Sequence, residues 1–247
     1  MSELVYPPVI ALARTWFRAV GLKITVTGAE HVPTSGGAVL ISNHISYLDF
    51  IFCGFGAVAS GRLVRFMAKK SVFEHRISGP LMRGMHHIPV DRDAGLASYK
   101  QALQALKDGE VVGVFPEATI SRSFTIKEIK SGAVRMAQSA QVPLIPVAVW
   151  GGQRLWTKGR PKRLTQRHVP VMVSVGEPMH PGRRDNGDAV TEELHRRMRD
   201  LLDEAQRDYP DQPSGPDDRW WLPVHLGGTA PTPEEAAEMD ARKPELF

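Results

Sequence analysis

Short apolar runs alternate with helical patterns along most of this 247-residue chain, and this alternation restricts its possible folds more than any other feature. Extended runs are expected at 23–27, 37–42, 63–67, 87–92, 111–115, 143–149 and 169–175. Helical spacing of apolar residues is expected at 8–21, 48–59, 77–85, 95–108, 130–140 and 189–206. Strands that alternate with helices predict an α/β fold, with a mainly parallel central sheet flanked by helices.

The chain is expected to consist of three parts. Residues 1–21 form an N-terminal amphipathic segment, 22–207 the α/β domain, and 208–247 a Pro-rich, acidic and extended C-terminal tail. Trp16 and Phe17 beside Arg14 and Arg18 favour a helix that associates with a membrane surface. The alternative is an ordinary amphipathic helix packed on the domain.

The tail contains one apolar island, at residues 220–224, and its residues 233–242 are expected to form a short acidic helix. The island either docks on the domain, which we favour, or enters a lipid headgroup layer. Residues 208–247 hold nine acidic and three basic residues, so residues 1–207 carry a net charge of +10. A basic body favours anionic partners, although such a surface is equally often only a solvated face.

Several classes of protein are not expected. The apolar run near the N-terminus has no basic segment before it and is broken by Pro7 and Pro8, so we expect no secretory signal. No stretch predicts a transmembrane helix, so a protein that acts on lipid would lie on the membrane without spanning it. The single Cys53 excludes an intrachain disulfide and a cysteine-based zinc cluster, and we expect it to be buried and inert. No metal and no cofactor are expected.

Polar residues follow three of the predicted strands, at 43–44, 91–92 and 117. The carboxyl ends of strands in such sheets are where chemistry takes place. His44 sits at a strand-to-helix corner, and Asp49 follows five residues later, within reach of its ring. A neutral imidazole oriented by a carboxylate can act as a general base. The alternative is a strand-capping His44 and an Asp49 that only interacts favourably with the helix dipole.

Four blocks of the sequence together resemble the glycerolipid acyltransferases, more specifically the bacterial 1-acylglycerol-3-phosphate acyltransferases. Residues 43–49 match the N-H-x4-D block, and the ranges 68–73 and 84–92 resemble the second block. Residues 115–119 (Phe-Pro-Glu-Ala-Thr) resemble the third block, and 142–147 the fourth. The resemblance covers roughly residues 20–180, so it identifies 22–207 as an acyltransferase domain.

The resemblance implies transfer of a fatty acyl group from acyl-CoA or acyl-carrier protein to a hydroxyl of lysophosphatidic acid or glycerol 3-phosphate. His44 is then the general base and Asp49 orients it. The acceptor-binding residues implied are Arg92 for the phosphate, Glu117 for the glycerol hydroxyls, and Thr119, Lys130 and Arg122 around them. Considered alone, Arg92 is better interpreted as a surface salt-bridge partner of Asp91 or Asp93, and Glu117 is equally a helix-start acid.

The third block departs from the family pattern. Ala118 replaces the usual Gly, and Ile120 stands where an Arg assists phosphate binding. This departure makes a larger lysophospholipid or glycolipid acceptor an alternative. A non-catalytic lipid-binding protein on the same fold is a separate alternative, which would need a degraded first block, whereas residues 43–49 keep that block intact. The resemblance also implies a membrane-surface partner and a peripheral location on the cytoplasmic face of the cell membrane. A nucleic-acid partner is not expected, because the basic stretch 154–167 has a single aromatic residue, Trp156.

Overall fold

The structure, a computed structural model, describes residues 3–91 and 95–242. A seven-stranded sheet forms its centre, in the order β1-β7-β6-β2-β5-β3-β4. Neighbouring strands are parallel except for β6 and β7, which pair antiparallel, so the predicted mainly parallel sheet is confirmed. The strands are β1 (Lys23–Thr27), β2 (Ala38–Ser42), β3 (Val64–Lys69), β4 (Ile88–Val90), β5 (Val111–Val114), β6 (Leu144–Trp150) and β7 (Pro170–Val175).

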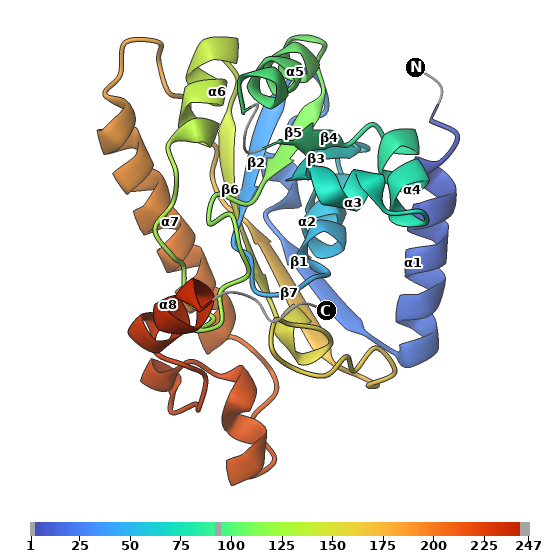
Figure 1. The fold of residues 1–247 in the computed structure, drawn as a ribbon, viewed down its shortest axis with the longest axis vertical. Helices are drawn as coiled ribbons and strands as arrows, with labels where there is room; N and C mark the ends of the chain where they lie inside the picture. The colour runs from blue at the N-terminus through green and yellow to red at the C-terminus, as the bar shows by residue number, and fades with distance from the viewer. Residues whose placement is uncertain (1–2, 92–94, 243–247) are drawn as a thin grey trace.

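Helices cover both faces of this sheet (Figure 1). The helices are α1 (Tyr6–Val20), α2 (Asp49–Val58), α3 (Lys70–Glu74), α4 (Ser78–Gly84), α5 (Gly95–Lys107), α6 (Gly132–Ala140), α7 (Gly187–Arg207) and α8 (Pro233–Ala241). Among the described residues, no helix has the length and apolar character needed to cross a membrane.

Alternation along the strands explains why both faces are covered. In β2, Ala38 and Leu40 pack in one core with α1 and α2, whereas Val39 and Ile41 pack in another with α5, α6 and α7. All five residues of β2 are buried. A strand with apolar side chains on both faces belongs at the centre of a parallel sheet. Cys53 of α2 is buried as predicted, and burial raises the pKa of its thiol to about 12.

The N-terminal helix begins earlier than predicted and packs on the domain. Pro7 and Pro8 lie in the first turn of α1, where the missing N–H groups have no intrahelical partner to lose. Phe17 is only 4% exposed and stacks on Phe52, and Trp16 donates a hydrogen bond to the Leu164 carbonyl. Phe17 is therefore a core residue and is not accessible to lipid.

The C-terminal tail folds back onto the domain. Two short 3₁₀ helices, η3 (Pro216–Trp221) and η4 (Val224–Leu226), follow α7, and the predicted acidic helix forms as α8. Trp220 and Trp221 are buried in a core shared with Trp150 and Tyr209. Docking of the apolar island on the domain, the interpretation favoured above, is therefore confirmed.

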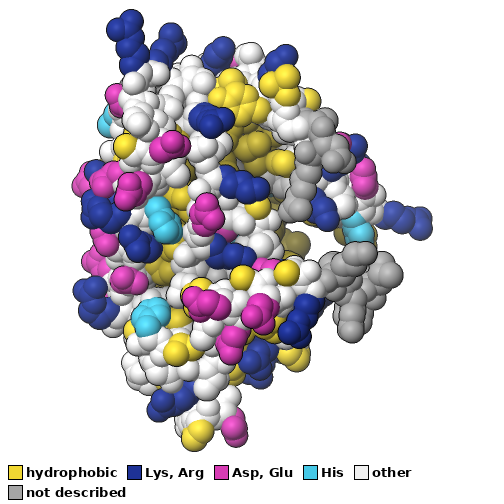
Figure 2. Space-filling model, turned by 60° about the vertical axis from the view of Figure 1, so that its left-hand side comes forward, with side chains coloured by type: hydrophobic (Ala, Val, Ile, Leu, Met, Phe, Trp, Pro, Cys, Tyr) yellow, Lys and Arg dark blue, Asp and Glu magenta, His cyan; other side chains and the backbone are white. Residues whose placement is uncertain are grey.

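At least one face of the molecule has no excess of positive side chains. Figure 2 shows basic and acidic side chains interspersed on the face that comes forward from the left of Figure 1, where α7 lies. Within α7, Arg196 pairs with Glu193 and Asp200, and Arg197 pairs with Glu193. These exposed pairs neutralise one another, so an anionic partner is better sought elsewhere.

Candidate active site

His44 lies just beyond the carboxyl end of β2, next to the carboxyl end of its parallel neighbour β5. Its ring Nδ1 is 3.0 Å from Oδ2 of Asp49, the first residue of α2. The same oxygen accepts hydrogen bonds from the backbone N–H groups of Ile45 and Ser46, both at 2.7 Å. The predicted side-chain contact between His44 and Asp49 therefore exists, and the carboxylate fixes both the turn and the imidazole.

The hydrogen bonds to Asp49 determine which ring nitrogen of His44 carries the proton. Oδ2 of Asp49 already accepts two backbone hydrogen bonds, so it acts as an acceptor toward Nδ1 as well. Nδ1 therefore donates, and Nε2 keeps its lone pair. Burial raises the pKa of Asp49, against the hydrogen bond from His44, which lowers it. The His44 side chain is 22% exposed, so its ring remains open to a substrate.

The loop after β5 holds the backbone of His44 from the other side. The His44 N–H donates to Glu117 Oε1 at 3.0 Å, and the His44 carbonyl accepts from the Ser121 N–H at 2.7 Å. Glu117 Oε2 accepts from the Lys127 N–H at 3.3 Å. Burial raises the pKa of Glu117 to about 8, against these two backbone hydrogen bonds, which lower it. Glu117 thus joins the two strand ends through backbone contacts.

The two departures in the third block have structural explanations. Ala118 has φ 59°, a left-handed conformation in which glycine is unstrained, which accounts for the usual Gly at this position. Such a conformation costs a non-glycine residue about 1 kcal/mol or more. Ile120 is 4% exposed, so it packs into the protein and offers nothing to a ligand.

The remaining predicted acceptor-binding residues do not all gather at one point. Arg122 is part-buried and its Nε lies 3.1 Å from Asp240 of α8. Thr119 accepts a hydrogen bond from Lys158 Nζ at 3.3 Å. Lys130 is exposed, and Arg92 lies outside the described residues. Of the predicted acceptor-binding residues, Glu117, Thr119 and Arg122 lie on one loop, and this loop contacts the His44 backbone.

Sequence reasoning missed the residues that support the His44 turn. The Asn43 side chain donates to the Val149 carbonyl at 2.9 Å and accepts from the Val149 N–H at 2.7 Å, which ties the end of β2 to β6. The Ser46 hydroxyl donates to the Trp156 carbonyl, and Thr157 donates to the Ile45 carbonyl. The basic stretch 154–167 thus braces the turn. The signal for Asn43 was its position directly before His44, at the end of a buried strand.

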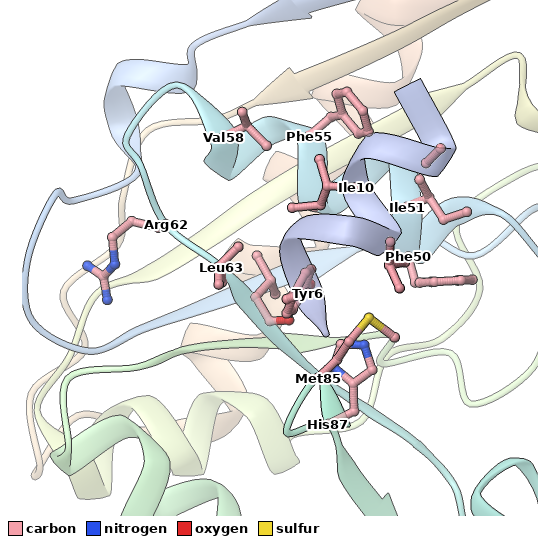
Figure 3. A pocket seen from close by; sticks show the side chains of 14 residues that line it. Tyr6, Ile10, Phe50, Ile51, Phe55, Val58, Arg62, Leu63, Met85 and His87 are labelled. Carbon is pink, nitrogen blue, oxygen red and sulfur yellow. The ribbon is translucent and has the colours of Figure 1, made fainter. Parts of the chain in front are cut away.

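An apolar groove lies close to this turn (Figure 3). Side chains of α1 and α2 line it, together with residues 62–64, 85 and 87, and its cavity volume is about 50 Å³. In Figure 3, Met85 and His87 lie at one end and Phe55 and Val58 at the other.

A series of aromatic rings connects this groove to His44. Phe50, which lines the groove, contacts Phe66 edge-on, Phe66 stacks on Phe115, and Phe115 stacks on the His44 ring at 4.5 Å between centroids. The imidazole therefore has a hydrophobic surface on one side and the polar loop 117–122 on the other.

No group of three or more His, Cys, Asp or Glu side chains that could hold a metal ion occurs in residues 3–91 and 95–242. His44, oriented by Asp49 between an apolar groove and a polar loop, can support proton transfer.

Comparisons with known proteins point in one direction. A sequence model of the family described as Acyltransferase matches residues 23–150. The 1-acyl-sn-glycerol-3-phosphate acyltransferase of Bacillus subtilis (strain 168) is 32% identical over 188 residues, which cover 72% of this chain and 87% of that protein. The enzyme of the same name from Limnanthes douglasii is 32% identical over 162 residues, covering 61% of this chain and 54% of that protein. The chain therefore spans about half the length of this plant relative.

The fold is shared with a solved structure. The crystal structure of the 1-acyl-sn-glycerophosphate (LPA) acyltransferase PlsC from Thermotoga maritima superposes with a TM-score of 0.68 and 20% identity. The similarity covers 83% of this chain and 81% of that one, which extends well beyond the matched range 23–150.

Proposed function

The chain belongs to the acyltransferase family, and from that premise we propose that it transfers a fatty acyl group from a thioester to the free hydroxyl of 1-acyl-sn-glycerol 3-phosphate. The names of the relatives support this acceptor. The observation that carries the proposal is the contact of His44 with Asp49, which leaves Nε2 of an open imidazole with its lone pair. Acyl-CoA or acyl-carrier protein is the proposed donor, and no cofactor is needed because the thioester is already activated.

In the proposed reaction, Nε2 of His44 removes the proton from the acceptor hydroxyl as its oxygen attacks the thioester carbonyl carbon. The C–S bond then breaks, and the leaving thiolate takes the proton back from His44. Asp49 stabilises the imidazolium that forms between these steps, as an orienting carboxylate does in a catalytic triad. Each proton that leaves the acceptor thus ends on the thiol product.

Two different surfaces near His44 are proposed to bind the acyl chain and the acceptor. The apolar groove of Figure 3 is proposed to take the acyl chain, because its lining is hydrophobic and aromatic rings lead from it to His44. The loop 117–122 is proposed to face the acceptor, with Glu117 and Thr119 near its glycerol hydroxyls. Arg92 and Lys130 remain proposals from the resemblance alone.

We further propose that the protein attaches peripherally to the cytoplasmic face of the membrane. Leu4, just before α1, and Leu12 of α1 are highly exposed, as is Ile77 beside α4. The helices α1, α3 and α4 share a small core, so these side chains extend from neighbouring elements. Exposed apolar groups flanked by arginines, such as Arg14 and Arg76, suit an anionic lipid surface. A nucleic-acid partner is not proposed.

The test is an activity matrix with purified protein. Palmitoyl-CoA and palmitoyl-acyl-carrier protein serve as donors, and 1-acyl-sn-glycerol 3-phosphate, glycerol 3-phosphate and a lysophosphatidylcholine serve as acceptors. His44→Ala is expected to lower kcat/KM by roughly 10²–10⁴-fold, because it removes the general base. The control is His225→Ala, a change at an exposed histidine in η4. Equal activity of wild type and His44→Ala would contradict the mechanism, and sole use of lysophosphatidylcholine would favour the larger acceptor.

A further inference from the structure

Helix α8 places one carboxylate among three cations. Asp240 lies 3.1 Å from Arg122 Nε and 2.9 Å from Lys127 Nζ, and it also contacts Lys158 Nζ. These four residues are called the Asp240 cluster below. Their side chains are 15–28% exposed, so solvent screens the charges only in part. Although partial burial acts in the opposite sense, the hydrogen bonds from the three cations lower the pKa of Asp240 to about 2.

Backbone hydrogen bonds connect the segments that carry the Asp240 cluster to the His44 turn. Arg122 follows Ser121, whose N–H donates to the His44 carbonyl. The Lys127 N–H donates to one oxygen of Glu117, and the other oxygen of Glu117 accepts from the His44 N–H. Two of the cations are thus carried by backbone segments held against the His44 turn.

The third cation comes from the loop that braces this turn. Lys158 contacts Thr119 Oγ1 at 3.3 Å as well as Asp240. The next residue, Gly159, has φ +77°, and a Cβ there would lie 2.4 Å from Nη1 of Arg122. The positive φ favours glycine at position 159, and a larger residue there would displace the end of the Arg122 side chain.

The charges in the cluster do not balance. Three cations surround one carboxylate, and within residues 3–91 and 95–242 no other acid forms an ion pair with any of the three. Glu117 is the acid nearest in the hydrogen-bond network, and burial raises its pKa to about 8, which disfavours its anion at neutral pH. A phosphomonoester dianion offers more charge and more acceptor oxygens than a carboxylate does. The cluster is therefore better matched to a phosphate than to Asp240.

Apart from the ion pairs of Asp240, helix α8 is held by little apolar packing. Ala236 is the single buried side chain of α8. A nine-residue helix is marginal by itself, even with the capping box between Thr232 and Glu235. The preceding segment is held independently, because Trp220 and Trp221 lie in the core. The end of α8 can therefore leave the cluster without unfolding the domain.

We propose that Arg122, Lys127 and Lys158 bind the phosphate of the acceptor, and that Asp240 occupies this site as an internal ligand which the acceptor displaces. The assignment rests on the proposed function for the identity of the acceptor. It also accounts for the buried Ile120, because Lys127 and Lys158 supply positive charge that position 120 lacks. Helix α8 then acts as a gate that opens for an anionic headgroup.

The test uses the full chain with Asp240→Asn, which removes the competing charge while keeping the shape. The matched control is Glu238→Gln, which removes one charge from an exposed position of the same helix. Isothermal titration with inorganic phosphate at fixed ionic strength is expected to show roughly five- to thirtyfold tighter binding in Asp240→Asn than in wild type. The KM for 1-acyl-sn-glycerol 3-phosphate is expected to fall similarly.

Two further variants keep the test independent of a single substitution. Ala236→Asp places a charge in the buried contact of α8 and is expected to raise phosphate affinity with Asp240 intact. Lys158→Met in the Asp240→Asn background is expected to abolish the gain. Circular dichroism of each variant checks that the domain remains folded.

The outcomes separate the two proposals. Acyl transfer with equal phosphate affinity in wild type and Asp240→Asn overturns the gate and leaves the function standing. The same gain in Glu238→Gln also overturns it, because the effect is then one of net charge. A gain specific to Asp240→Asn without acyl transfer to any acceptor supports the anion site and rejects the proposed function.

Discussion

At the scale of single residues, the candidate site depends on two buried carboxyl groups with different tasks. Asp49 collects three hydrogen bonds on one oxygen and thereby orients the His44 ring. Glu117 accepts two backbone N–H groups, one on each oxygen, and holds the His44 backbone. Both carboxyl groups have a raised pKa because burial disfavours the charged form. The free energy of unfolding therefore depends on the protonation of these two carboxyl groups.

This dependence gives a prediction for Glu117→Gln. The pKa of Glu117 rises from 4.5 to about 8 on folding, so in this window the folded protein binds more protons than the unfolded chain. The free energy of unfolding of the wild type is then expected to fall with rising pH, by up to about 1.4 kcal/mol per pH unit relative to the variant. Urea unfolding at pH 5 and pH 8 measures this, with Glu128→Gln as an exposed control. Parallel pH dependence in wild type and Glu117→Gln would contradict it.

At the scale of elements, the C-terminal tail is part of the domain. Trp221 is fully buried, its ring lies under the Arg154 guanidinium at 4.6 Å, and its carbonyl accepts from the Gln153 side chain at 3.2 Å. Arg154 begins the stretch 154–167 that braces the His44 turn through Trp156 and Thr157, and Gln153 directly precedes it. The tail therefore supports the site through the loop 154–167. Trp221 of η3 makes the contacts that attach the tail to this loop.

Trp221→Ala is expected to lower the free energy of unfolding by about 3–5 kcal/mol, because it leaves a large cavity in a packed core. Val224→Ala, three residues later at a half-exposed position, is expected to change it by less than about 0.5 kcal/mol. Urea denaturation of the full chain measures both. A loss for Trp221→Ala as small as that of the control would show that the tail docks without contributing to stability.

At the scale of the whole molecule, the sheet separates two functional sides. One core joins α1 and α2 to the sheet, and the apolar groove lies on this side; the other joins α5, α6 and α7. The exposed apolar residues of α1 and α4 lie on the side of the groove, so a membrane there would deliver lipid substrates directly to it. Helix α7, with its paired charges, faces away from this surface (Figures 1 and 2).

The membrane proposal predicts an effect confined to one side of the molecule. Leu12→Gln with Ile77→Gln removes two side chains that are 71% and 74% exposed. Binding to vesicles rich in phosphatidylglycerol is expected to weaken about thirtyfold or more, because each of the two leucine-sized groups contributes about 1 kcal/mol or more when inserted. The matched control is Leu96→Gln with Leu226→Gln, on α5 and η4. Equal losses for the two double variants in co-sedimentation would argue against this surface.

The sequence by itself determined the elements and the contact between His44 and Asp49. Runs of β-branched residues between helical patterns require a layered α/β fold, and parallel strands necessarily bring their carboxyl ends to one edge. His44 and Asp49 meet because five residues across a strand-to-helix corner leave little freedom. Four blocks in order were enough to identify the family. These are local features, in which residue type and spacing limit the geometry directly.

The tertiary structure decided whatever depends on segments distant in the chain. By its residue type, Phe17 could lie in a membrane helix or in a protein core, and its packing against Phe52 places it in the core. Asp240 meets Arg122 across more than one hundred positions, and no local pattern relates the two. Position 118 shows the same limit, since its left-handed backbone is fixed by the loop around Glu117. Such contacts depend on the sum of many weak interactions in the folded chain, and that sum cannot be calculated from residue spacing alone.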